Sequence, residues 1–169
     1  MLCNFGVINQ LGLLEMVLNG RGKWTEAVED EAHNSARYIP ALSAPALAFL
    51  GDAVEVDDPD DIDAIQRIRR ARFGGMDPNK PREHLGEAET CYVIMHNSAY
   101  TGSKWITDDR DALEFAKRQQ IDTWETWHVM SEAVVNGYVT EYEGFDLLLD
   151  IERERPGLRR PKRPAELRQ

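Results

Sequence analysis

The chain has 169 residues and a formal net charge of −10, with 42% hydrophobic and 30% charged residues. This length and balance predict one soluble globular domain that is large enough to bury a core. The negative charge argues against broad electrostatic binding of nucleic acid, which needs many Lys and Arg contacts to phosphates. It does not exclude a nuclease, because a compact acidic site that binds a cation becomes a local site for phosphate.

Cysteine content and hydropathy indicate the compartment. Cys3 and Cys91 are too few for a disulfide framework and have no Cys or His partners at zinc spacing. No apolar run reaches the roughly 18 residues that a membrane span needs. We therefore expect a reduced, cytoplasmic protein without membrane contacts.

In chain order, the first half of the sequence predicts mainly helices, from apolar periodicity and from turn and cap residues. The expected elements are a helix over 6–18 that Asn19 and Gly20 end, a helix over 26–38 with Thr25 as N-cap, a strand over 53–56, a helix over 57–71 with Ile62, Ile65 and Ile68 at helical spacing, and a loop over 73–83.

The second half alternates helices and short strands. We expect a helix over 85–99, a strand over 104–107, a helix over 110–119, a strand near 121–125, a helix over 127–136 that Gly137 ends, and a last helix with a capping box of Thr140 and Glu143. Strands separated by helices of this length imply a parallel sheet covered on both faces. The predicted fold class is α/β, a three-layer α/β/α sandwich with a central, mostly parallel sheet.

The last residues differ in composition from the rest. Residues 152–169 are rich in Arg and Pro, which predicts a disordered basic tail after a domain over 1–151. Such a tail has one of two roles: it keeps the protein soluble, or it contacts RNA or a protein partner. The composition leaves both alternatives open.

Two adjacent aspartates, Asp108 and Asp109, stand where the strand over 104–107 gives way to a helix. One interpretation is helix capping, because Asp accepts hydrogen bonds from free N–H groups at a helix N-terminus. The other is a site for a hard divalent cation at the carboxyl end of a strand, where functional groups collect in such sheets. Glu31 and Glu87 could converge there, although each also suits an ordinary helix position.

The motifs "LGEAET", "WITDDRDALEFAKRQQIDTWET" and "VNGYVTEYEGFDLLLDI", with "LCNFGVINQLGLLEMVL" and "WTEAVEDEA" before them, resemble the PIN domain family over residues 1–151. Many bacterial members are VapC-type toxins that antitoxins hold inactive. The resemblance implies a nuclease that cleaves single-stranded RNA through carboxylates that bind Mg²⁺ or Mn²⁺. It also implies an antitoxin as partner, and it allows a homodimer.

Residue by residue, the resemblance implies Glu31, Glu87 and Asp109 as catalytic residues and Glu31, Glu87, Asp108 and Asp109 as metal ligands. Glu89 replaces Glu87 if the register is shifted, Asp111 could assist, and Asn4 matches a polar residue at the start of the family's first helix. These residue types suit the chemistry, since Mg²⁺ and Mn²⁺ prefer oxygen ligands and usually retain waters.

One departure from the family lies at the N-terminus. The family begins with a hydrophobic strand that ends in an aspartate, just before the residues that match "LCNF". That strand would lie upstream of Met1, so we expect a version extended by about one strand to fold better and to cleave RNA.

Two other hypotheses compete with a nuclease. One is a PIN-like module that binds an antitoxin or RNA without cleaving, and the other is a phosphatase-like α/β enzyme, which would need a nucleophilic Asp at a first strand end. The aromatic residues near the C-terminal helices fit either a core or an interface with a partner; they are Trp124, Trp127, Tyr138, Tyr142 and Phe145.

Overall fold

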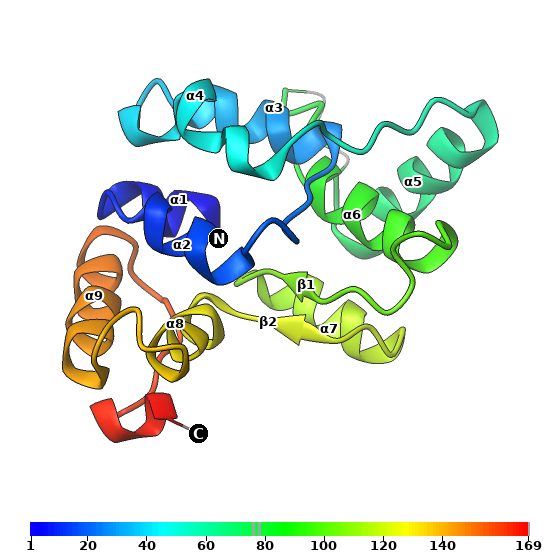
Figure 1. The fold of residues 1–169 in the computed structure, drawn as a ribbon. Coiled ribbons are helices and arrows are strands. Elements are labelled where there is room, and N and C mark those ends of the chain that lie inside the picture. Colours follow the sequence, from blue (N-terminus) through cyan, green and yellow to red (C-terminus); the bar gives the residue numbers. More distant parts are fainter. Residues whose placement is uncertain (76, 78, 169) are drawn as a thin grey trace. The chain divides into compact units, whose positions relative to one another are not determined.

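The computed structural model describes residues 1–75, 77 and 79–168, and it is mainly helical (Figure 1). Of the described residues, 59% are helical and 4% lie in strands or bridges. The predicted three-layer α/β/α sandwich with a central sheet is therefore wrong. Two compact units make up the chain instead: unit 1 is Met1–Gly22, Ala32–Gly51 and Trp124–Gln169, and unit 2 is Lys23–Glu31 and Asp52–Thr123.

The predicted sheet is reduced to two short parallel strands, β1 (Trp105–Ile106) and β2 (Thr123–Trp124). The strand predicted over 53–56 makes a single parallel bridge, between Val54 and Thr25. Helix α5 begins at Pro59, a few residues later. Without neighbouring strands to pair its N–H and C=O groups, a longer strand has no hydrogen-bond partners.

Unit 2 is built on three helices that follow the predicted pattern: α5 (Pro59–Arg72), α6 (Leu85–His96) and α7 (Arg110–Arg118). Helix α6 ends at His96, short of the predicted residue 99. The helices α5 and α6 pack on each other, and α6 contacts β1. Their shared core contains Ile65, Phe73, Ala88, Cys91, Tyr92, Ile94, Trp105, Ala112, Phe115 and Ala116. Burial raises the pKa of the Cys91 thiol to about 12, so Cys91 is a packing residue.

Unit 1 begins with two helices where the sequence predicted one over 6–18. These are α1 (Leu2–Val7) and α2 (Leu11–Leu18), and Asn9 between them has a φ of 53°. Asn tolerates this left-handed conformation better than most residues, and one such residue breaks the helix. The predicted end of α2 is confirmed, because Asn19 adopts a left-handed C-cap conformation.

Helix α3 (Glu26–Ser35) starts in unit 2, and its last residues belong to unit 1. Short helical turns follow in unit 1, at residues that the sequence left unassigned: η1 (Pro40–Leu42), α4 (Ala44–Leu47) and η2 (Ala48–Leu50). Their side chains complete a core in which these residues are fully buried: Phe5, Leu14, Leu42, Leu47, Val129, Met130, Leu148 and Ile151.

The C-terminal part of unit 1 contains α8 (Thr126–Val135), α9 (Glu141–Glu154) and η3 (Pro164–Arg168). The capping box of Thr140 and Glu143 is confirmed at the start of α9. The domain boundary predicted after residue 151 falls inside α9. The tail is folded rather than disordered, because Leu167 of η3 is fully buried against α8 and α9.

Three residues lie outside the described part of the chain: Met76 and Pro78 in the predicted loop over 73–83, and Gln169 at the end of the predicted tail. Within the part that is described, no helix is both long enough and apolar enough to span a membrane.

Candidate functional site

The predicted catalytic residues all belong to unit 2. Glu31 lies on α3, and Glu87 lies in the first turn of α6. Asp108 and Asp109 lie in the connection from β1 to α7. Unit 2 is therefore the part of the chain in which a site can be sought.

Glu31 and Glu87 are brought together by the N-terminus of α6. The carboxylate Oε1 of Glu31 accepts a hydrogen bond from the backbone N–H of Gly86, at 3.3 Å. Loss of water around this carboxylate raises the pKa of Glu31, and the negative charge of Glu87 raises it further. Gly86 permits the approach, because a Cβ there would lie 3.0 Å from Glu31 Oε1.

Basic groups flank this pair. His84 Nδ1 lies 3.9 Å from Glu87 Oε2, and Arg82 forms an ion pair with Asp30 on α3. The charges of Arg82 and His84 lower the pKa of Glu31, opposing the larger effect of burial. The result is a mixed acidic and basic surface at the start of α6.

Glu89 has a structural role on the next turn of α6. Its Oε2 accepts a hydrogen bond from the backbone N–H of Ala27, at 3.0 Å, in the first turn of α3. The residue is 7% exposed, and burial raises the pKa of Glu89. The first N–H groups of a helix have no partner within the helix. Glu89 supplies a side-chain acceptor for the start of α3. The sequence predicted Thr25 as the N-cap residue there.

The contacts of Glu31 and Glu89 are reciprocal: an acid on α3 caps α6, and an acid on α6 caps α3. We call this pair of contacts the cross-cap. Sequence reasoning treated Glu31 as a ligand and Glu89 as its alternative in another register. It missed the cross-cap because each acceptor is far from its donor along the chain.

Replacing Glu89 by Ala is expected to lower the free energy of unfolding by about 1–3 kcal/mol, the cost of leaving a buried donor without a partner. Glu89→Gln keeps an acceptor oxygen and removes a charge that burial disfavours, so it should be at least as stable as the wild type. Urea denaturation measures both. Glu83→Ala, which removes a partner of the surface residue Lys80, is the control and should cost less than about 1 kcal/mol. Equal stability of the Ala and Gln variants would contradict the cross-cap.

Asp109 is the N-cap of α7. Its Oδ1 accepts a hydrogen bond from Ala112 N at 2.8 Å, and its own N–H donates to Thr107 Oγ1 at 3.2 Å. Of the two interpretations of Asp108 and Asp109, capping is thus observed for Asp109. Asp111 lies in the first turn of the same helix.

Among residues 1–75, 77 and 79–168, no group of three or more His, Cys, Asp or Glu side chains is arranged to hold a metal ion. Asn4, the remaining predicted residue, lies in unit 1, where its Nδ2 donates to Thr126 Oγ1 at 2.9 Å and both residues are buried. What the structure does bring together is the pair Glu31 and Glu87.

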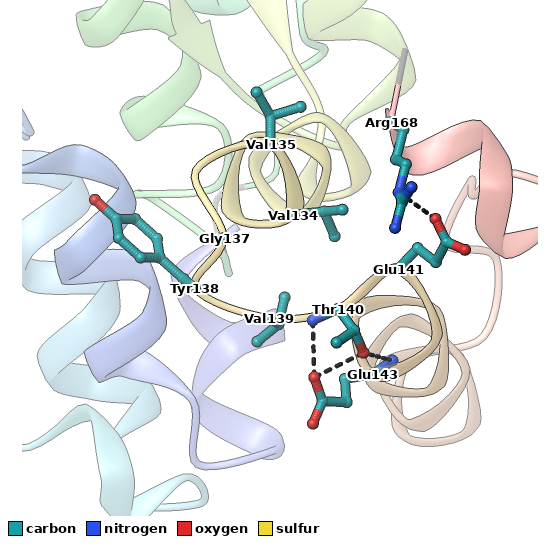
Figure 2. A pocket seen from close by; sticks show the side chains of 9 residues that line it. All are labelled: Val134, Val135, Gly137, Tyr138, Val139, Thr140, Glu141, Glu143 and Arg168. Carbon is teal, nitrogen blue, oxygen red and sulfur yellow. Dashed lines mark hydrogen bonds and ion pairs between the residues drawn. The ribbon is translucent and has the colours of Figure 1, made fainter.

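Two shallow pockets lie away from these acids. One, of about 540 Å³, lies in unit 1 beside the turn from α8 to α9 and is shown in Figure 2. The other, of about 400 Å³, lies in unit 2 and is lined by Asp63, Gln66, Arg69, Arg70, Gly75, Asp77 and Pro81. Neither contains a predicted catalytic residue, so pocket shape does not select the acidic pair.

The chain was compared with family models, curated proteins and solved structures. No family model, no curated protein and no solved structure matches the chain.

Proposed function

We propose that the chain is a divalent-cation-dependent endoribonuclease that cleaves single-stranded RNA and acts as the toxin of a toxin–antitoxin pair. The observation that carries this proposal is the pair Glu31 and Glu87 at the N-terminus of α6. Glu31 accepts a hydrogen bond from Gly86 N–H at 3.3 Å, Glu87 is the next residue of that first turn, and its charge raises the pKa of Glu31. Neighbouring carboxylates repel each other, and a cation relieves the repulsion.

The donor chemistry of the pair fits Mg²⁺ or Mn²⁺. Mg²⁺ is usually bound through one or two carboxylates and keeps several waters, so it does not need a full set of protein ligands. Glu31 and Glu87 are the residues that would hold it. The cation supplies Lewis acidity, which lowers the pKa of a bound water and offsets charge on a phosphate.

The neighbouring residues have roles in holding substrate. Arg82 and His84 place basic groups beside the acidic pair, and such groups attract the phosphates of RNA. Arg82 also forms an ion pair with Asp30 on α3, and both side chains are exposed, so a phosphate can compete for the guanidinium. A phosphate held by Arg82 would lie next to the carboxylates that hold the cation.

Cleavage of a labelled single-stranded RNA tests the proposal. We expect cleavage with Mg²⁺ or Mn²⁺, none with excess EDTA, and recovery when Mn²⁺ is added back. A duplex of the same sequence is the control substrate, and we expect it to be cleaved more slowly. Cleavage that EDTA leaves unchanged would contradict the role of the cation, and intact RNA under all conditions would contradict the nuclease.

The same proposal includes an antitoxin as partner and a cytoplasmic location. Two exposed tyrosines support a protein partner, Tyr138 at 42% and Tyr142 at 68% exposure, because Tyr is enriched at interfaces. The two free cysteines, Cys3 and Cys91, fit a reducing compartment.

A further inference from the structure

Residues 156–168, which we call the C-terminal strap, lie on the paired helices α8 and α9 of unit 1 (Figure 1). Leu167 is the anchor of the strap, with a fully buried side chain. Ser131 on α8 donates a hydrogen bond from Oγ to the Leu167 carbonyl at 2.7 Å. Gly144 on α9 allows α8 to pack closely beside it, since a Cβ there would lie 3.0 Å from Val134 Cγ2 and 3.2 Å from Met130 Cγ. We call the surface of α8 and α9 that holds Leu167 the α8–α9 groove.

The rim of this groove is acidic and the strap is basic. Three arginines of the strap each pair with a glutamate of the helices or their caps: Arg159 with Glu125, Arg160 with Glu152 and Arg168 with Glu141. The guanidinium of Arg160 also lies 5.2 Å from the centre of the Phe145 ring. The match of charges along the strap is the pattern of a bound basic peptide.

A pocket lined by both apolar and charged residues adjoins the end of the groove. Figure 2 shows the ion pair between Arg168 and Glu141 at one side of this pocket, with Val134 and Val139 among the side chains that line it. Its volume of about 540 Å³ is within the usual range for small binding sites. A segment that continues past its leucine with an apolar residue could fill it.

We propose that the α8–α9 groove is a docking site for a basic, leucine-anchored segment of a partner protein, and that the strap is a resident occupant which such a partner displaces. The ion pairs that hold the strap involve partly exposed side chains, which exchange partners readily and weaken with salt. The acidic rim repels a polyanion, so the occupant is a peptide and not RNA. The inference goes beyond the proposed function, and none of its steps depends on RNA cleavage.

Fluorescence anisotropy of a labelled synthetic peptide of residues 156–168 tests the docking site with the full-length chain. Leu167→Asp removes the apolar anchor from the resident strap and vacates the groove. We expect this variant to bind the peptide at least about tenfold more tightly than the wild type, whose groove is occupied. A peptide carrying Leu167→Ala should bind the variant at least about tenfold more weakly, because the leucine is the buried anchor.

A shuffled peptide of the same composition separates docking from simple attraction to a protein with a net charge of −10. Equal binding of the shuffled and native peptides would overturn the proposal, as would equal binding of the native peptide by the wild type and the variant. A second variant, with Arg159→Glu and Arg168→Glu, is measured alongside at low salt. It keeps Leu167 and repels the strap from Glu125 and Glu141, so it decides by the same criteria if Leu167→Asp does not fold.

Discussion

Replacing Glu87 by Gln is expected to lower the rate of single-stranded RNA cleavage by about a hundredfold, near the upper end of the losses seen when groups that support a metal are removed. The amide keeps the size of the side chain and removes the charge that raises the pKa of Glu31. Glu31→Gln should lose activity similarly, while its amide oxygen can still accept from Gly86. Initial rates with Mn²⁺ measure both variants, and circular dichroism verifies that they fold.

Two matched variants sharpen this result. Glu83→Gln changes an acid close to Glu87 in sequence that pairs with Lys80, and it should cleave at the wild-type rate. Asp109→Asn keeps a capping oxygen for Ala112, so a loss of cleavage without a loss of stability would assign Asp109 to the reaction. Glu87→Gln that cleaves at the wild-type rate would remove the acidic pair from the proposed function.

Replacing Leu167 by Ala is expected to lower the free energy of unfolding by about 2–5 kcal/mol, the usual cost of truncating a buried leucine. The side chain is fully buried, and the hydrogen bond from Ser131 to its carbonyl fixes the backbone beside it. Urea or thermal denaturation measures the change.

Lys162→Ala is the control for this prediction. Lys162 lies in the same segment and is exposed, so its truncation should change stability by less than about 0.5 kcal/mol. If Leu167→Ala and Lys162→Ala were equally stable, the C-terminal strap would be disordered, as its composition suggests.

Local features of the fold could be predicted from the sequence. The capping box of Thr140 and Glu143 and the left-handed end at Asn19 were confirmed, because each depends on residues within one helical turn. Helix α7 was predicted within one residue of its observed end, Arg118, since its apolar positions recur at helical spacing.

Features that depend on distant partners could not be predicted. The segment 53–56 has the composition of a strand, yet Val54 finds a single bridge to Thr25, and a strand exists only if a neighbour pairs with it. The composition of the strap also led to a wrong expectation, because its Pro and Arg residues are typical of disorder and the segment is folded. Its order comes from Leu167 and from glutamates elsewhere in unit 1.

The acidic pair was predicted only in part. Glu31 and Glu87 were singled out as acids that could converge and then from a family resemblance. The structure places both at the N-terminus of α6, where Glu31 accepts a hydrogen bond from Gly86 and Glu87 lies in the first turn. Their partners Gly86 and His84 were not singled out, although the glycine in "LGEAET" signals a close approach of another group to the helix. The grouping of these acids with Asp108 and Asp109 stays a prediction.

The cross-cap has a consequence for how unit 2 folds and opens. The amides of Ala27 and Gly86 find their side-chain acceptors 62 and 55 positions away in the sequence. Closing such long loops costs entropy before the contacts form, so these bonds arise late in folding. The amides of Ala27 and Gly86 are protected from hydrogen exchange only while α3 and α6 stay together. We therefore expect exchange at both amides to report a single opening event that separates α3 from α6.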